Sequence, residues 1–508
     1  MTHSFHKLSL LSGLHKASVF AIDEIVVDLT EVEGRTIEQK DSMGTPLARA
    51  AENGREEVVW ELLSRDDIDP DRPGADGETP LIRAARNGHS GVVKMLLERD
   101  DVDPNKPNQD GEVPLMSAAQ NGHSRVVEML LGRDDIDPDQ PDEDGQTPLL
   151  VAAYNGHEGV VKMLLGRDDV NPNKLNEDGV TPLLWAVWNR QEGVMKALLG
   201  RDDVNPNPQD DEGRTPLSWA AEQGCEALVR LLLGRDDINP NTPDGDGDTP
   251  LLWAVENEHE ALVKLLLGKG KVDPDKPNKG GKTPLLLAAY IGHEGIVEML
   301  LERDDVNPNK PDKDGQTALY CSARHGNDRI VEMLLGRDDI DPNTSNEDGQ
   351  TPFYRAAWCG YWEIVEMLLK RDDLDTNKPD NDGRTPLLLA VYDGHERVVN
   401  MLLGRADVNP NKPDKDGETP LLWAACNGRE AMVKLLLERG DVNTDQPGED
   451  GQTPLLQAVR NGHERVVKML LGRNDIDPNK PDSLGRTPLW WATENGHAGV
   501  IALLQPPA

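Results

Sequence analysis

The sequence is poor in cysteine, in aromatic residues and in positive charge. Four cysteines among 508 residues cannot form a disulfide framework, which is typical of a protein from a reducing compartment. Lysine and arginine number 54 against 92 aspartate and glutamate residues, a formal net charge of −38. This balance excludes a broadly basic, phosphate-seeking surface, and we therefore expect no direct nucleic-acid binding.

Long apolar runs are also missing. No segment reaches the roughly 18 apolar residues of a membrane-spanning helix, and residues 8–14 are too short and too polar in their flanks for a signal peptide. The apolar fraction of 37 %, to which 47 glycines add, is that of a folded chain rather than a disordered acidic tail. We expect a soluble intracellular protein, cytoplasmic or nuclear, that does not bind a membrane.

A 34-residue repeat dominates what is present. The tripeptide Thr-Pro-Leu begins at Thr45 and recurs at intervals of 34 residues up to Thr487, with variant copies at Val113, Thr317 and Thr351. When the threonine is counted as position 0, 34 of the 37 prolines fall on positions 1, 25 and 28. Fourteen copies without an insertion therefore cover residues 45–508.

The repeat at residues 283–316 shows what each copy is built to form. Thr283 is a suitable helix N-cap, and Pro284 suits the first helical position, where its missing N–H costs no hydrogen bond. Gly292 ends this short helix, and a second helix with a wide apolar face is expected from about residue 294. A polar stretch rich in Pro, Asn, Asp and Gly then turns the chain back. Because neither helix is stable alone at this length, neighbouring copies must supply the missing contacts.

The pattern TPLxxAAxxGHxxxVxxLLxxxxDVN resembles the ankyrin repeat, although ankyrin repeats usually have 33 residues and these have 34. The resemblance implies an all-α repeat solenoid of stacked helix-turn-helix repeats with short hairpin connections. It also implies a concave groove lined by first helices and hairpins. We expect the array to occupy residues 41–508 and residues 1–40 to form an end cap. Trp490, Trp491 and Leu503 look unprotected at the other end, so we expect either a partner there or a longer chain.

Residues that could carry chemistry are few. Eight of the twelve histidines fall on position 10, which predicts a structural hydrogen bond repeated in each copy rather than a metal ladder. The four cysteines have no metal-ligand spacing, and residues 244–248 alternate carboxylates without the rest of a calcium loop. Phosphate loops and nucleophile elbows are missing. We therefore expect no catalytic, cofactor or metal site, and hence no enzyme.

Position 7, near the groove in the family that the chain resembles, varies between copies. It carries five of the 19 aromatic residues. Tyrosine, tryptophan and arginine dominate binding hot spots, so we expect a partner-binding row there. The alternative is partial burial against the next helix, without a partner. The predicted partner-binding residues are Tyr154, Trp188, Tyr290, Arg324, Trp358 and Tyr392.

Three further features depart from the common repeat. Tryptophans at position 4 are expected in the core, namely Trp185, Trp219, Trp253, Trp423 and Trp491. Repeats nine and ten diverge, either as co-adapted packing or as the centre of a binding surface, at Tyr320, Cys321, Ser322, Phe353, Tyr354, Trp358, Tyr361 and Trp362. Arg190 and Glu258 replace the turn glycine and should strain or lengthen those turns.

Two classes of function fit these observations. The first is a non-catalytic interaction scaffold that binds a protein partner in the concave groove, with a transcription co-regulator as its nuclear variant. The second is the targeting or sensor array of a larger enzyme or signalling protein. Acidic hairpin tips favour basic protein partners, and we expect no small-molecule ligand and no cofactor.

Overall fold

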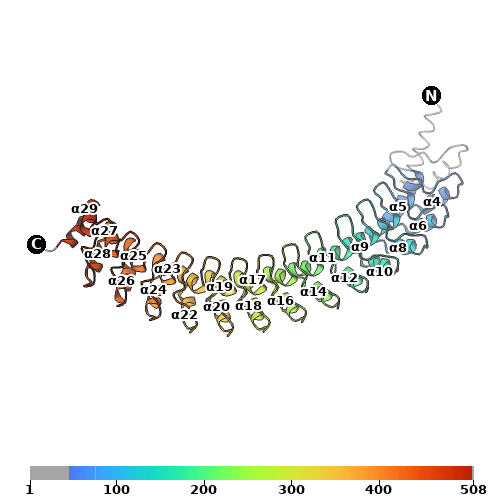
Figure 1. The fold of residues 1–508 in the computed structure, drawn as a ribbon. Helices are drawn as coiled ribbons and strands as arrows, with labels where there is room; N and C mark the ends of the chain where they lie inside the picture. The colour runs from blue at the N-terminus through green and yellow to red at the C-terminus, as the bar shows by residue number, and fades with distance from the viewer. Residues whose placement is uncertain (1–44, 75, 506–508) are drawn as a thin grey trace, which may run out of the picture. The chain divides into compact units, whose positions relative to one another are not determined.

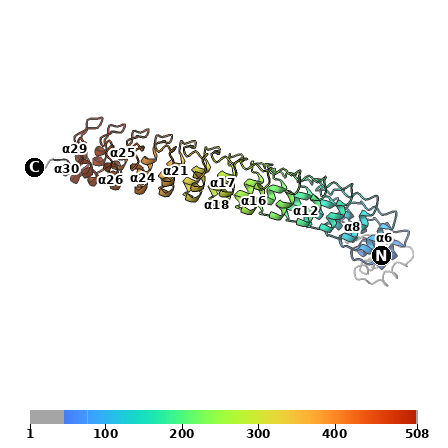
Figure 2. The ribbon, with the colours of Figure 1, turned by 90° about the horizontal axis from the view of Figure 1, so that it is seen from below.

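The computed structural model describes residues 45–74 and 76–505, so the expected end cap at residues 1–40 lies outside the described residues. The described residues form 28 helices and no strand, arranged as fourteen pairs, which confirms the expected all-α repeat solenoid. They fall into two compact halves that divide between Trp253 and Ala254. Within each half, first helices stand in one row and second helices in another, and hairpins project past the first helices (Figures 1 and 2).

The pairs follow the repeat without a gap. In the amino-terminal half the helices are α3 (Pro46–Glu52), α4 (Glu56–Leu63), α5 (Pro80–Arg86), α6 (Ser90–Leu97), α7 (Pro114–Gln120), α8 (Ser124–Leu131), α9 (Pro148–Asn155), α10 (Glu158–Leu165), α11 (Pro182–Trp188), α12 (Glu192–Leu199), α13 (Pro216–Glu222) and α14 (Glu226–Leu232). The division between the halves falls within α15 (Pro250–Glu256).

The same order continues in the carboxyl-terminal half. Its helices are α16 (Glu260–Leu267), α17 (Pro284–Ile291), α18 (Glu294–Leu301), α19 (Ala318–His325), α20 (Asp328–Leu335), α21 (Pro352–Cys359), α22 (Trp362–Leu368), α23 (Pro386–Asp393), α24 (Glu396–Leu403), α25 (Pro420–Cys426), α26 (Glu430–Glu438), α27 (Pro454–Arg460), α28 (Glu464–Leu471), α29 (Pro488–Glu494) and α30 (Ala498–Leu504). Among the described helices, none has both the length and the apolar character to cross a bilayer.

Most first helices begin and pack as the repeat predicts, whereas α7 has Val113 at its N-cap without a side-chain hydrogen bond and α19 begins with Ala318. The Thr283 hydroxyl accepts the Leu286 N–H at 3.2 Å, and Pro284 occupies the first helical position. Ala288 and Ala289 are fully buried, so neighbouring first helices can approach closely. Most second helices bury a Val-Val or Ile-Val pair and a leucine in the same way. Burial of each such side chain contributes about 1.5–3 kcal/mol, and these faces are covered only by the next repeat.

An arginine that follows each of most second helices bonds to the preceding repeat and is held in place by an aspartate two residues later. Arg133 donates through Nη1 to the carbonyl oxygen of Leu97 at the end of the preceding second helix, at 2.9 Å, and pairs with Asp135 through Nε and Nη2. A cation at this point satisfies a helix C-terminus that would otherwise lack donors. The guanidinium also lowers the pKa of Asp135 below its ordinary value. The carbonyl contact recurs from Arg99, Arg167, Arg201, Arg235, Arg303, Arg337, Arg405, Arg439 and Arg473.

A second inter-repeat joint lies at position 26. The Asn105 amide donates to the Asp135 carbonyl oxygen at 2.6 Å, and its Oδ1 accepts the Asp137 N–H at 2.9 Å. The same two bonds recur from Asn173, Asn207, Asn309, Asn343, Asn377 and Asn411. Where aspartate takes this position, one carboxylate oxygen keeps the N–H bond but the other is buried without a hydrogen-bond donor, at Asp71, Asp139, Asp275 and Asp445.

The turn within each pair needs a residue in the left-handed region. Twelve repeats supply glycine, but Arg190 and Glu258 adopt φ of 55° and 58°, which confirms that these two turns are strained. Glycine also leaves room for the next repeat, because a Cβ on Gly88 would lie 2.6 Å from Nδ1 of His123. Beside Glu258 the histidine of the next repeat is turned, and Nδ1 of His293 accepts the Ile296 N–H at 3.2 Å.

Candidate protein-binding face

The position-7 side chains lie at the C-terminal ends of the first helices, where the helix meets its turn. Tyr154, Tyr290 and Tyr392 are 50 %, 46 % and 44 % exposed, and Arg324 is exposed as well. Trp188 and Trp358 are half-buried. The six predicted residues therefore reach solvent rather than the core. They belong to the helices α9, α11, α17, α19, α21 and α23.

Four of the six form one row in the carboxyl-terminal half. Tyr290, Arg324, Trp358 and Tyr392 come from α17, α19, α21 and α23, four consecutive first helices that pack side by side. A neighbouring ring supports Tyr392, because its ring centroid lies 4.0 Å from that of Trp423. A side chain at position 7 can therefore pack against the next repeat on one side and remain exposed to solvent on the other. Tyr154 and Trp188 lie in the other half of the chain.

The prediction that the position-4 tryptophans are core is wrong. All five are half-buried, because position 4 faces the preceding hairpin rather than the interior. Trp219 donates through Nε1 to Asp210 at 2.8 Å, nine residues earlier. The same spacing gives Trp253–Asp244 at 2.9 Å and Trp491–Asp482 at 3.1 Å. An aspartate nine residues before the tryptophan is therefore the sequence signal that places Trp219, Trp253 and Trp491 against the hairpin.

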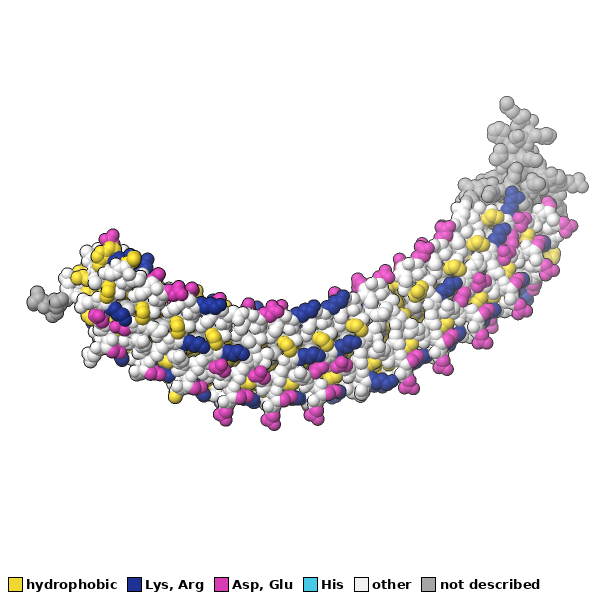
Figure 3. Space-filling view, in the orientation of Figure 1, with side chains coloured by type: hydrophobic (Ala, Val, Ile, Leu, Met, Phe, Trp, Pro, Cys, Tyr) yellow, Lys and Arg dark blue, Asp and Glu magenta, His cyan; other side chains and the backbone are white. Residues whose placement is uncertain are grey.

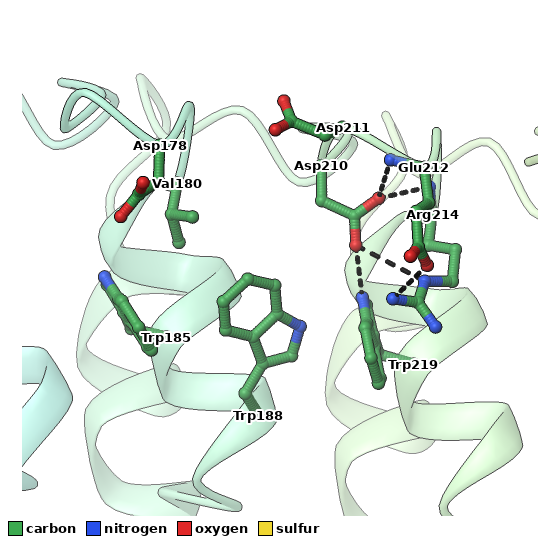
Figure 4. A pocket seen from close by; sticks show the side chains of 9 residues that line it. All are labelled: Asp178, Val180, Trp185, Trp188, Asp210, Asp211, Glu212, Arg214 and Trp219. Atoms are coloured by element: carbon green, nitrogen blue, oxygen red, sulfur yellow. Dashed lines mark hydrogen bonds and ion pairs between the residues drawn. The ribbon is translucent and has the colours of Figure 1, made fainter. Parts of the chain in front are cut away.

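Position-4 and position-7 rings meet in an aromatic cleft in the amino-terminal half (Figure 4). Tyr154, Trp185, Trp188 and Trp219 contact one another edge to face in that order, with ring centroids 4.8, 5.0 and 5.5 Å apart. The cleft encloses about 400 Å³ and opens between two hairpins. Sequence reasoning placed only Trp188 of its tryptophans on the binding face. Its lining consists of Asp178, Val180, Trp185, Trp188, Asp210, Asp211, Glu212, Arg214 and Trp219.

Two indole N–H groups in this cleft have no acceptor. Nε1 of Trp185 and Nε1 of Trp188 are both buried without a hydrogen-bond partner among the described residues. For Trp185 the cause is Asn176, which stands where Trp219 has its aspartate nine residues earlier. Asn176 uses its Oδ1 to accept the Val180 N–H at 2.8 Å. Its other terminal atom is an amide donor, which cannot accept from the indole.

The electrostatics of the face come from the hairpins. Asp142 accepts the N–H groups of Asp144 and Gln146 at 3.1 and 2.7 Å, and most hairpins repeat this turn. The Glu143 N–H then donates to the carbonyl oxygen of Asp110 in the preceding hairpin, at 3.1 Å, which links the tips. Figure 3 shows acidic side chains along the hairpin edge of the amino-terminal half, and a mixture of acidic and basic side chains along that edge of the carboxyl-terminal half. The tips of the amino-terminal half therefore present carboxylates on hydrogen-bonded turns.

Some of the divergent side chains of repeats nine and ten lie in the core, and others lie at the surface. Tyr320, Cys321, Phe353 and Tyr354 are buried. The Tyr354 hydroxyl donates to Asp380 at 2.5 Å, and burial together with this carboxylate raises its pKa. Co-adapted packing explains these residues. Trp358, Tyr361 and Trp362 remain half-buried at the surface.

Most histidines at position 10 form a structural hydrogen bond to the preceding repeat. Nε2 of His123 lies 2.9 Å from the Arg86 carbonyl oxygen at the end of the preceding first helix. Because a carbonyl only accepts, this ring nitrogen carries the proton. The contact recurs from His89, His157, His395, His463 and His497, which confirms the predicted repeated hydrogen bond.

Among the groups that could support metal or thiol chemistry, Asp244 is hydrogen-bonded within its hairpin and Cys321 is buried in the core. Asp244, in the segment that alternates carboxylates, accepts from the Asp246 and Asp248 N–H groups and from Trp253. Burial raises the pKa of the Cys321 thiol to about 12, and all four cysteines are free. Within residues 45–74 and 76–505, no three His, Cys, Asp or Glu side chains are placed to hold a metal ion.

Comparison with known proteins agrees with this architecture. A family model described as ankyrin repeats in three copies matches overlapping segments along the chain. Curated proteins provide no match. The matched segments are residues 14–108, 47–142, 101–174, 168–244, 191–278, 235–312, 251–346, 305–380, 338–414, 371–446, 405–482 and 440–507. Together with the repeated helix pairs, this match shows that the chain belongs to the ankyrin repeat family.

Proposed function

We propose that this protein is a non-catalytic scaffold that binds a protein partner along the face formed by the first helices and hairpins. Ankyrin repeats are in general protein–protein interaction modules. The observation that carries the proposal is the row of Tyr290, Arg324, Trp358 and Tyr392, one large side chain from each of four consecutive first helices. Tyrosine and tryptophan rings supply wide contact area at small entropic cost, and arginine is enriched with them in binding hot spots.

In the amino-terminal half, the hairpins favour a partner with positive charge. The hairpin tips carry exposed carboxylates such as Glu143, Asp144, Glu177 and Asp178. A field of one sign speeds the encounter with an oppositely charged partner and weakens as salt rises. We therefore assign basic proteins as the partner class, held by aromatic contacts and guided by the tips.

Photocrosslinking tests where a partner binds. A benzophenone amino acid replaces Tyr290 in the full chain, which keeps an aromatic ring at that exposed site. The matched control places the same amino acid at Glu298, an exposed residue on the second helix α18 of the same repeat. The proposal predicts discrete crosslinked protein adducts in cells from position 290 and few from position 298. Equal adducts from both sites, or none from position 290, would contradict it.

A further inference from the structure

The aromatic cleft has two unmet requirements. It presents more negative than positive charge, with Arg214 as its one cation and four carboxylates, those of Asp178, Asp210, Asp211 and Glu212. It also holds the two buried indole N–H groups of Trp185 and Trp188, which lack an acceptor among the described residues. A matching ligand must therefore bring positive charge and hydrogen-bond acceptors together. A cationic peptide does so, because its side chains carry the charge and its backbone carbonyls accept.

Arg214 shows which cation the cleft accommodates. Its guanidinium lies 3.6 Å from the ring centroid of Trp219 and pairs with Glu212. A planar guanidinium can thus stack on an indole while it faces the hairpin carboxylates. Trp188 stands between Trp185 and Trp219 below the same hairpins (Figure 4). Repeat five is the one repeat whose sequence has tryptophan at both position 4 and position 7.

We propose that this cleft binds an arginine side chain of a basic peptide segment. The guanidinium stacks on the Trp188 indole and pairs with the exposed carboxylates of Asp178 and Asp211. Backbone carbonyls on either side of the arginine accept from the Nε1–H groups of Trp185 and Trp188. The proposal rests on the proposed function, since the segment belongs to a protein partner, and it specifies what one part of the face recognises.

Arginine fits these walls better than lysine. Its flat guanidinium stacks on aromatic faces and pairs with two carboxylate oxygens at once, whereas an ammonium is a compact and strongly hydrated point charge. The volume of about 400 Å³ admits a long side chain together with the backbone that carries it. An acidic segment would meet the carboxylates with the same sign and be repelled.

Fluorescence polarisation of a labelled peptide tests the assignment on the full chain. The probe is a seven-residue peptide with two arginines among glycines and serines. The matched peptides carry citrulline, a neutral isostere, or lysine at the same two positions. We expect the arginine peptide to bind, the lysine peptide to bind more weakly and the citrulline peptide not to bind measurably. Equal binding of the citrulline peptide would overturn the proposal.

Variants then locate the contact. Trp188→Ala should weaken binding about 5- to 30-fold, the range of a cation–π contact that is partly to fully desolvated. The double variant Asp178→Asn/Asp211→Asn changes exposed hairpin tips only and should weaken binding about fivefold, with a smaller dependence on salt. Trp60→Ala, at an exposed tryptophan of the second helix α4, is the matched control and should leave peptide binding unchanged.

The outcomes separate this proposal from the proposed function. Unchanged affinity in both cleft variants, with the helical circular dichroism of the wild type, would show that the peptide binds elsewhere and overturn the arginine site. The same would follow if Trp60→Ala weakened binding as much as Trp188→Ala. If the peptide fails to bind while crosslinking at position 290 still yields partner adducts, the arginine site is wrong and the scaffold stands.

Discussion

Replacing Asp139 by asparagine should strengthen the joint between two repeats. At Asp139, Oδ2 accepts the Asn171 N–H at 2.7 Å, and Oδ1 is buried without a donor. In the next repeat, the Asn173 amide fills the equivalent place and donates to the Asp203 carbonyl oxygen at 2.7 Å. The Asp139→Asn variant should therefore gain a hydrogen bond that seven other joints already have.

The expected gain can be worked out from the contacts. One intramolecular hydrogen bond contributes about 1 kcal/mol, and removing a buried acceptor that has no donor adds to this. Against it stands the attraction between the carboxylate and Lys174, whose ammonium also donates to the Asp139 carbonyl oxygen at 2.7 Å. A partly exposed pair of this kind contributes about 0.2–1 kcal/mol. The net change is a stabilisation of about 1 kcal/mol at neutral pH.

The gain should depend on pH with a definite sign. Burial raises the pKa of Asp139 above its ordinary value of 3.8, while the Asn171 N–H and Lys174 oppose the shift. A folded-state pKa above the unfolded value means that the charged carboxylate destabilises the fold at neutral pH. This cost is lost as the pH falls through the folded value towards 3.8. A protonated carboxyl can also donate as the amide does. The advantage of Asp139→Asn should therefore be largest near pH 7 and shrink as the pH approaches about 4.

Hydrogen exchange measures this joint locally, because repeat arrays open in parts. In the full chain, exchange of peptides covering residues 135–175 should slow about fivefold in Asp139→Asn at pH 7. The matched control is the reverse change, Asn173→Asp, where the next repeat has Pro208 in place of the lysine. It should accelerate exchange across residues 169–209. Unchanged or faster exchange in Asp139→Asn at pH 7, or a gain that does not shrink in acid, would refute the reasoning.

Three further predictions concern the turns, the bridges and the thiols. Glu258→Gly should stabilise the fold by about 1 kcal/mol in urea denaturation, because glycine adopts the left-handed conformation without strain. Arg190→Gly should gain less, since it also loses the hydrogen bond of 2.9 Å from the Arg190 side chain to Gln223. A loss of stability in both variants would contradict the strain at these turns. His123→Ala should cost about 1 kcal/mol by removing the bridge to Arg86, and a neutral effect would argue against it. Cys321, with its pKa raised to about 12, should resist iodoacetamide at pH 8 in the folded chain and react in denaturant, as mass spectrometry can check.

The repeated architecture could be predicted from the sequence because each repeat contains the capping residues of its own helices. Thr283, Pro284 and Gly292 mark the start, first turn and end of one helix, and the structure has these caps. The strain at Arg190 and Glu258 followed from the missing glycine alone. Such features are local, and local chemistry determines them.

The candidate site was less predictable because it depends on contacts between repeats. The exposure of Tyr290 and Tyr392 could not be read from position 7 itself, since burial there depends on the next helix. Trp185 and Trp219 were assigned to the core because position 4 points between the helix layers in the family that the chain resembles. Their true neighbours are hairpin residues nine positions earlier, such as Asp210. The aromatic cleft needs side chains from two repeats, which no single repeat pattern reveals.

The central claim, that the exposed row of first-helix side chains binds a protein partner, is tested most directly by one paired measurement. Trp358→Ala/Tyr392→Ala in the full chain is compared with the wild type for partner capture in a quantitative pull-down and for thermal melting. The account predicts that capture is lost while the melting temperature falls by no more than about 2–4 °C, since both rings reach solvent. Unchanged capture, or a sharp fall in melting temperature that marks the rings as core, would contradict it.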